Sequence, residues 1–272
     1  MRWVVHGLVA MCLAPPALAA DLDDTFLRGS QYEPGTPVYF RWSGIYGGLQ
    51  AGGSAATGNF AGNEGPVIAN AAGGTPIPPS SVANLISLSV NDTQFKPSYG
   101  AFFGYNAQWE NVVLGVEVNY NHTSAMLSSS DARSATVLSV SGAETYTVNV
   151  SATSSAKLTD FGTIRGRAGW VFDNWMPYAL FGIAVGRTES VQTASVSYDR
   201  VFPVPPPGLV GSVTASASQS NIRYGWALGA GLDWAVLPNV FVRGEYEYVD
   251  LGNLQGLALR VNSVRGGVGM KF

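Results

Sequence analysis

Charged residues are scarce in this 272-residue chain, because Asp, Glu, Lys and Arg make up only 12% of it. A typical soluble domain has roughly twice that share. Long apolar runs are also missing, since no stretch beyond residue 20 approaches the roughly 18 residues that a membrane-spanning helix needs. These two shortages argue against both an ordinary soluble domain and a helical membrane protein. The net charge of −3 gives no reason to expect a nucleic acid partner.

Apolar residues and glycine are abundant instead. The chain is 46% hydrophobic and 11% aromatic, and it contains 33 glycines. That many aromatic and β-branched residues argue against disorder throughout. The composition therefore indicates a β-rich chain whose apolar residues are dispersed rather than gathered in blocks.

The single cysteine, Cys12, lies in a segment with the features of a secretory signal peptide. A positive start precedes an apolar stretch over 4–13, and residues 17–19 (ALA) form a small-x-small cleavage motif. We predict a signal peptide over 1–19 with cleavage after Ala19, or after Ala20 as the less favoured site. Cleavage would leave no thiol for a disulfide or a thiolate metal site.

The predicted secreted chain has two parts, an N-terminal periplasmic arm over 20–41 and a β-barrel domain over 42–272. Strict alternation of apolar and polar residues dominates the second part, most clearly over 112–121. Strands of about 11 residues suit a tilted membrane crossing better than a soluble sheet. We predict strands at 43–55, 95–109, 112–124, 157–172, 175–188, 222–236, 240–250 and 261–272.

The connections between these strands alternate in length. Tight turns are expected at 110–111, 173–174 and 237–239, and long mobile loops at 56–94, 125–156 and 189–221, with a shorter one at 251–260. Short turns at one rim and long loops at the other are typical of an outer-membrane barrel. We therefore predict an all-β fold, an eight-stranded antiparallel transmembrane up-and-down β-barrel. A soluble sandwich with its apolar faces inward is the alternative.

Tryptophan supports this orientation. Five tryptophans lie beside the start of the domain or beside a short turn, and they are expected at the membrane–water interface: Trp42, Trp109, Trp170, Trp175 and Trp234. A second aromatic girdle is expected at the opposite rim: Tyr99, Tyr120, Tyr224, Trp226 and Tyr248.

Charged residues within the strands all fall on the non-apolar face. With the apolar face toward lipid, they would point into the lumen: Glu117, Arg165, Arg167, Asp233, Arg243, Glu245, Glu247, Arg265 and Lys271. They could form either the constriction of a channel or a salt-bridge network that plugs the barrel. The plug is favoured, because eight strands enclose only enough space for side chains to fill.

Four segments and the last residue resemble the outer-membrane immunogenic, porin-like family of small barrels in Gram-negative bacteria. The segments are 42–48 (WSGIYGG), 162–169 (GTIRGRAG), 177–178 (PY) and 225–231 (GWALGAG). The resemblance implies an outer-membrane location, and it implies that Phe272 presents the terminal aromatic to the barrel-assembly machinery. Because relatives have been linked to haem binding, ligand capture by the loops is a minor alternative function.

An enzyme is not expected. Apart from the predicted signal peptide, the chain has one histidine, His122, which together with Ser124 resembles the His-x-Ser arrangement of a lipid A deacylase. The further residues of that motif are missing. No metal-binding motif is present either, so no cofactor is predicted.

The function predicted from the sequence is structural and surface-presenting, with a largely plugged lumen, in the bacterial outer membrane. Outer-membrane lipid and lipopolysaccharide are the expected partners. The main alternative is a narrow porin for small solutes, in which Arg165, Arg167, Arg243 and Glu117 would set selectivity.

Overall fold

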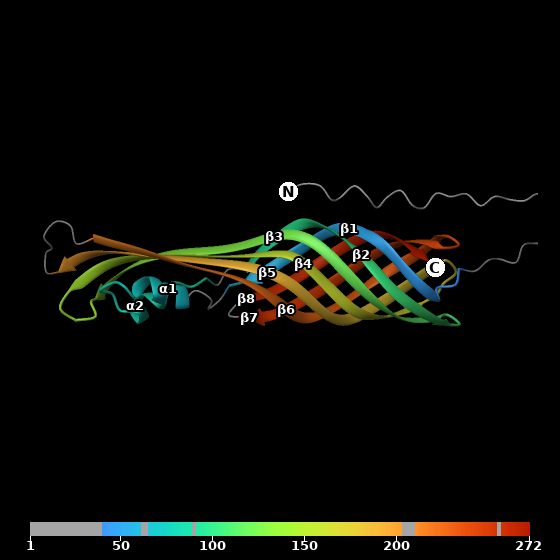
Figure 1. Ribbon diagram of the computed structural model, residues 1–272, viewed down its shortest axis with the longest axis horizontal. Coiled ribbons are helices and arrows are strands. Elements are labelled where there is room, and N and C mark those ends of the chain that lie inside the picture. Colours follow the sequence, from blue (N-terminus) through green and yellow to red (C-terminus); the bar gives the residue numbers. More distant parts are fainter. Residues whose placement is uncertain (1–39, 61–64, 89–90, 203–209, 255–256) are drawn as a thin grey trace, which may run out of the picture. The chain divides into compact units, whose positions relative to one another are not determined.

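A computed structural model describes residues 40–60, 65–88, 91–202, 210–254 and 257–272 (Figure 1). The predicted signal peptide and nearly all of the predicted periplasmic arm lie outside these residues. Eight strands form one closed barrel in sequence order. They are β1 (Gly44–Asn59), β2 (Asn91–Trp109), β3 (Val112–Leu138), β4 (Thr145–Trp170), β5 (Trp175–Phe202), β6 (Val210–Leu237), β7 (Val240–Leu254) and β8 (Leu257–Lys271).

Every strand pairs antiparallel with its sequence neighbours, and β1 closes the ring by pairing with β8. The tight turns lie where the sequence predicts them, and Glu110 and Asp173 adopt positive φ angles of 52° and 50° there. The up-and-down barrel predicted from alternation and turn spacing is thus confirmed.

The orientation of the strand faces is confirmed as well. The outward residues Leu114, Val116 and Leu228 are 48%, 62% and 51% exposed, whereas Arg165 and Glu245 on the other face are 2% and 4% exposed. An apolar exterior around a charged interior is the reverse of a soluble β-protein and is the arrangement that hydrocarbon requires.

The predicted loops over 125–156 and 189–221 are largely wrong. Strands β3 to β6 continue far beyond the other four, over 26 to 28 residues each. Figure 1 shows them running on as a four-stranded sheet past the barrel. At about 3.3 Å per residue, the 14 residues of β3 beyond Ser124 add roughly 45 Å. We call this four-stranded sheet the extension.

The predicted loop over 56–94 is also largely structured. It contains the end of β1, the start of β2 and two short helices, α1 (Gly65–Ala72) and α2 (Pro79–Ala83). The helices pack against one face of the extension, where Ile68, Ile77 and Val82 are fully buried with Val148 and Val196. No helix in the described part of the chain is long and apolar enough to cross a membrane.

The sequence hides the extension because its outer face carries small polar side chains. Ser151, Thr153, Ser195 and Thr214 lie there, with Val148, Val150 and Ala152 buried behind them. Ser and Thr suggest loops by composition, yet the alternation over 147–152 is that of a strand with one covered face. Composition was therefore a poorer guide than periodicity in this segment.

Candidate functional site: the filled lumen

The candidate site is the interior of the barrel, where charged side chains from five strands converge. Pairing register places three of the ion pairs directly opposite each other on neighbouring strands: Glu117 and Arg165, Asp233 and Arg243, and Glu245 and Arg265. Alternation sends each of these side chains inward. The network is thus fixed by strand register and not by loops.

Arg165 is the centre of the network. Its Nε–H donates to Glu117 Oε1 at 3.1 Å, Nη1 donates to Glu247 Oε1 at 2.6 Å, and Nη2 donates to Glu245 Oε2 at 2.9 Å. The side chains of all four residues are at most 1% exposed. One guanidinium therefore joins three carboxylates from two distant parts of the chain in a water-poor environment.

The other three arginines complete the network. Arg243 donates from Nε to Asp233 Oδ1 at 2.9 Å and from Nη1 to Glu117 Oε2 at 2.8 Å. Arg167 Nη2 reaches Asp233 Oδ2 at 2.7 Å, and Arg265 Nη2 contacts both Glu245 and Glu247. Four arginines thus balance four carboxylates. We call these eight residues the lumen network.

Aromatic side chains lie next to the lumen network on the side of the short turns. The Arg243 guanidinium lies 4.0 Å from the Phe102 ring centroid, and that of Arg167 lies 3.9 Å from the Tyr178 ring centroid, within the range of cation–π contact. Tyr46 donates its hydroxyl hydrogen to Glu117 at 2.7 Å, and Tyr178 donates to Glu245 at 2.8 Å. These rings form the floor of the lumen together with Phe40, Trp42, Met176, Leu180 and Phe241.

Amide and hydroxyl groups fill the lumen beyond the lumen network. Gln50 Nε2 donates to Asn121 Oδ1 at 2.6 Å and to Asn119 Oδ1 at 3.1 Å. The Ser54 hydroxyl lies 2.9 Å from that of Ser98 and 2.8 Å from that of Ser263. These residues are at most 4% exposed.

An apolar layer follows where the barrel meets the extension. Its side chains are all at most 2% exposed and belong to the same buried cluster as the two helices: Phe60, Leu127, Leu158, Phe161, Leu251 and Leu257. The described interior is thus occupied in succession by aromatic, ionic, amide and apolar side chains.

Two of the predicted site residues lie elsewhere. Lys271 is outside the lumen network, because β8 ends beside the N-terminal segment, where Lys271 Nζ donates to the Arg41 carbonyl and lies 5.2 Å from the Phe40 ring. Trp42 is 2% exposed and is not at the membrane interface. Its ring packs between Phe40 at 4.5 Å and Phe241 at 5.8 Å inside the barrel mouth.

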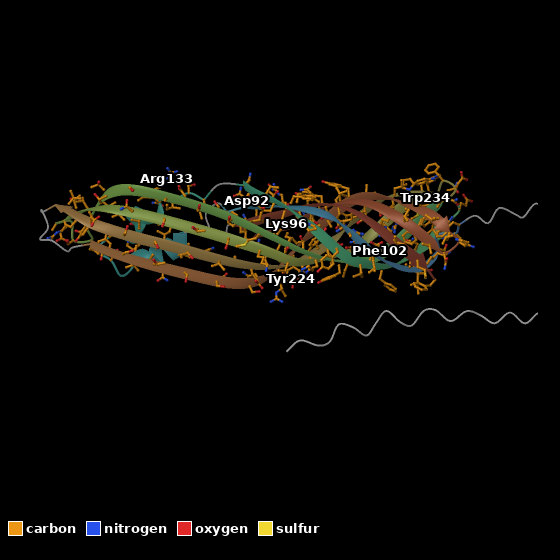
Figure 2. All side chains as sticks on the ribbon, turned by 90° about the horizontal axis from the view of Figure 1, so that it is seen from above. Asp92, Lys96, Phe102, Arg133, Tyr224 and Trp234 are labelled. Carbon is orange, nitrogen blue, oxygen red and sulfur yellow. The ribbon has the colours of Figure 1, made fainter. Side chains whose placement is uncertain are left out.

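The other four predicted interface tryptophans face outward. Trp109, Trp170, Trp175 and Trp234 are 41% to 60% exposed. Trp175 and Trp234 stack with ring centroids 5.0 Å apart, and Figure 2 shows Trp234 at the barrel end that lies away from the extension. Phe272 is 75% exposed, and its backbone N–H donates to the Ile45 carbonyl at 2.9 Å.

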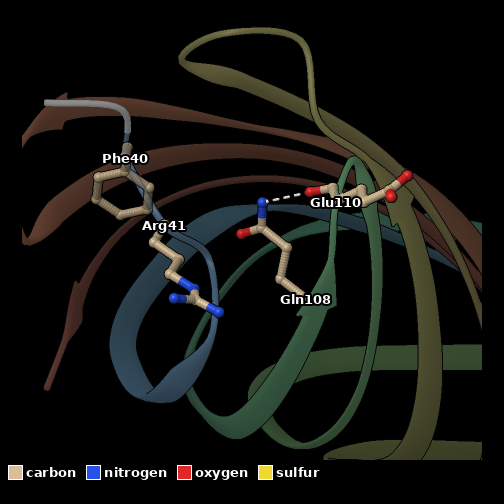
Figure 3. A pocket seen from close by; sticks show the side chains of 4 residues that line it. All are labelled: Phe40, Arg41, Gln108 and Glu110. Atoms are coloured by element: carbon tan, nitrogen blue, oxygen red, sulfur yellow. Dashed lines mark hydrogen bonds between the residues drawn. The ribbon is translucent and has the colours of Figure 1, made fainter. Parts of the chain in front are cut away.

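A hollow of about 310 Å³ lies at the barrel mouth near Phe40 (Figure 3). Phe40, Arg41, Gln108 and Glu110 line it, and Gln108 Nε2 donates to the Glu110 carbonyl at 2.8 Å. Among the described residues, its lining provides one guanidinium group and one carboxylate.

His122 lies at the outer surface where the barrel meets the extension. Its Nδ1 lies 2.9 Å from Asp160 Oδ1, and its ring lies 5.2 Å from that of Tyr99. No hydrogen bond joins His122 to Ser124 in the described structure. The pair that the sequence suggested for catalysis is therefore not assembled.

Sequence reasoning did not identify the two tyrosines that hydrogen-bond to the lumen network or the amides that lie beyond it. Tyr46, Tyr178, Gln50 and Asn119 occupy inward positions between residues that the alternation assigns outward. The signal was available, because a large aromatic or amide group at an inward position of a narrow barrel has only other lumen side chains to contact. The apolar layer could not be found from strand alternation, because Phe60, one of its members, follows the end of β1 and lies outside any strand.

Comparison with known proteins agrees with this architecture. A family model described as an outer membrane protein beta-barrel domain matches residues 41–272. The 25 kDa outer-membrane immunogenic protein of Brucella ovis is 27% identical over 173 residues, which cover 64% of this chain and 62% of that protein. The 31 kDa outer-membrane immunogenic protein of Brucella melitensis is 28% identical over the full length of both chains.

Among solved structures, Ail, the attachment invasion locus protein of Yersinia pestis, matches 84% of this chain and 99% of its own. Its sequence identity is 13% and its TM-score is 0.34, which is too low to support a comparison of sites. The family model, by contrast, spans the whole barrel and its extension. The chain belongs to the outer membrane protein beta-barrel domain family and is an outer-membrane β-barrel protein.

Proposed function

We propose that this protein is a structural, surface-presenting component of the outer membrane whose lumen is closed by its own side chains. The observation that supports this proposal is the lumen network, in which four arginines and four carboxylates are at most 4% exposed. Each charge is held by partners on other strands, so a solute could pass only if several ion pairs opened together. Breaking buried pairs costs several kcal/mol for each uncompensated charge.

The layers on both sides of the lumen network support the same role. The aromatic floor contacts Arg167 and Arg243 directly, and the apolar layer is continuous with the core beneath the extension. Water would have to wet both layers before it reached the charges. The extension then presents a polar face outside the apolar band of the barrel, as a surface-exposed protein requires.

Recordings across a planar bilayer that contains the refolded protein test the closed lumen. We expect no discrete conductance steps at moderate voltage. The matched positive control is the double variant Arg165→Ser and Glu117→Ser. It removes one cation and one carboxylate together, so the remaining charges of the lumen network stay balanced. Discrete steps from the wild-type protein would overturn the proposal in favour of the narrow porin.

We also infer that β8 and Phe272, which follows it, form the segment that the barrel-assembly machinery engages. The support is that Phe272 is 75% exposed and its side chain packs little, although its backbone closes the ladder to β1. A residue with this small a packing role is free to serve recognition during assembly.

A further inference from the structure

We propose that a groove on the outer wall of the barrel binds an acyl chain of lipid A, with a lipid phosphate held by Arg187 and Lys157 above it. The groove has a volume of about 320 Å³ and lies on β3 to β6. The inference deepens the proposed envelope role, because it names one lipid and one site for it. Tyr120, Asp160, Phe161, Gly162, Val185, Gly186, Arg187 and Ile222 line the groove.

The position of the groove follows from strand register. One row of outward residues across β3 to β6 is Val118, Ile164, Ile183 and Trp226, and all four side chains are apolar. The next row is Tyr120, Gly162, Val185 and Tyr224. Figure 2 shows Tyr224 where the barrel meets the extension. Tyrosines at this height mark the membrane–water interface.

Glycine creates the space. Gly162 lies between Tyr120 and Val185 in its row, so a gap one side chain wide opens between two apolar walls. A Cβ atom placed on Gly162 would have one neighbour within 4 Å outside its own strand segment, the Asn119 carbonyl oxygen at 3.2 Å. The hollow is therefore lined mainly by apolar side chains on the outer wall of the barrel, where an acyl chain is the available ligand.

Charged side chains appear one row further from the short turns. That row contains His122, Asp160, Arg187 and Ile222, and Lys157 and Glu189 pair in the row beyond it. The Arg187 side chain is 61% exposed, and its ion pair in the described structure is a long contact of 3.9 Å with Glu189. A weakly engaged guanidinium above an apolar groove fits a lipid that carries both acyl chains and phosphate.

The carboxylates at this rim are partly compensated by other donors. Asp160 Oδ1 accepts from the Tyr120 hydroxyl at 2.6 Å and lies 2.9 Å from His122 Nδ1. The Glu189 side chain is 48% exposed, and its Oε1 lies 3.9 Å from Arg187 Nη2, which is a long contact. Arg187 and Lys157 are thus the cations available to a phosphate at this level of the barrel.

Native mass spectrometry of the refolded full-length mature protein, titrated with lipid A in detergent, tests the proposal. We expect one lipid A per protein, bound about tenfold more weakly by Gly162→Leu, which fills the groove. The matched control is Gly166→Leu. Gly166 faces outward on the same strand, and a Cβ atom added there would lie 3.9 Å from the Phe181 carbonyl oxygen, its nearest neighbour. Unchanged affinity in Gly162→Leu would overturn the groove.

A second pair of variants avoids the glycine. Ile222→Ala removes part of one groove wall, whereas Ile183→Ala removes a similarly exposed isoleucine from the neighbouring row outside the groove. We expect weaker lipid A binding in Ile222→Ala alone. Equal binding by the two variants would contradict the proposal even if Gly162→Leu failed to fold.

The phosphate contact has its own test. Arg187→Gln should reduce the preference for lipid A over its dephosphorylated form, whereas Arg260→Gln, an exposed arginine paired with Asp250 elsewhere on the rim, should leave that preference unchanged. Phosphatidylglycerol that bound as tightly as lipid A, or inorganic phosphate that displaced the lipid, would overturn the assignment to lipid A. Conductance steps would overturn the closed lumen but leave this site standing, so the two failures are distinguishable.

Discussion

Glu117 and Arg165 face each other directly across β3 and β4, and the two oxygens of Glu117 contact three different arginines, Arg165, Arg167 and Arg243. A single carboxylate thereby joins β3, β4 and β7 through the middle of the barrel. Glu117 is thus the acidic counterpart of Arg165, which contacts three carboxylates.

Replacing Glu117 by Gln should strongly destabilise the barrel, because three buried guanidinium groups lose a common charged partner. We expect the free energy of unfolding to fall by about 3–5 kcal/mol. Urea unfolding, followed by the difference in gel mobility between unboiled and boiled protein, measures the change. Glu189→Gln is the control, since the exposed ion pair of Glu189 with Arg187 should contribute at most about 1 kcal/mol to stability. Equal effects of the two variants would contradict the ranking.

Ile68→Asp should detach α1 from the extension without opening the barrel. The Ile68 side chain is fully buried in an apolar cluster, where a carboxylate would be costly to desolvate. Limited proteolysis should then cleave within the helical segment while the rest retains its heat-dependent gel shift. Asn70→Asp adds the same charge to an exposed position of the same helix and should remain protected.

The fluorescence quenching of Trp42 should differ from that of the tryptophans at the membrane interface. In variants that retain one tryptophan, brominated lipid should quench Trp234, which is 41% exposed, and should leave Trp42, which is 2% exposed, nearly unquenched. Strong quenching of Trp42 would show that the barrel mouth is not packed as described.

The contact between Asp131 and Ser87, a residue that follows α2, should weaken in acid. The Ser87 backbone N–H donates to Asp131 Oδ2 at 3.3 Å and, with Arg133 and the Ala132 N–H, holds the pKa of that carboxyl below its usual value. A lowered pKa means that the stabilisation is present at neutral pH and is lost as the pH falls through it. NMR shifts of the Ser87 amide should titrate accordingly, and Asp131→Asn should abolish that titration.

Phe272→Ser should slow assembly without lowering the stability of the finished barrel. The side chain is 75% exposed and contributes little packing, so we expect the unfolding free energy to change by less than about 0.5 kcal/mol. The rate of insertion with the assembly machinery should fall severalfold, whereas Lys271→Ser should insert at the wild-type rate. An unchanged rate in Phe272→Ser would argue against this residue as a signal.

The barrel could be predicted from the sequence because lipid imposes a strict rule on each strand. Residues such as Val116 and Glu117 alternate between an apolar outer face and an inner face across the apolar band, and the turns at Glu110 and Asp173 interrupt the alternation where the sequence predicts them. The charged members of the lumen network follow from the same alternation. The contacts between distant strands, such as that of Arg243 with Glu117, do not follow, because an arrangement across the lumen leaves no mark on either strand alone.

The extension was mistaken for loops for a related physical reason. Outside the membrane no rule requires apolar side chains on the outer face, so Ser151 and Thr153 are as acceptable there as in a loop. The inner face does show alternation at Val148 and Val150. However, α1, which covers the inner face, belongs to the connection between β1 and β2, so β4 alone does not reveal it. Trp42 was misplaced because its ring enters the barrel mouth instead of following the wall.

The long strands have a mechanical consequence. Each of β3 to β6 runs from the short turns to the far part of the extension as one ladder, and the pairing of β3 with β4 shifts register only between His122 and Ala125. A pull on the distal hairpin would therefore load many backbone hydrogen bonds in shear at once. Force applied to the extension would therefore reach the barrel wall, and the register shifts near His122 and Leu158 interrupt the ladders along the way.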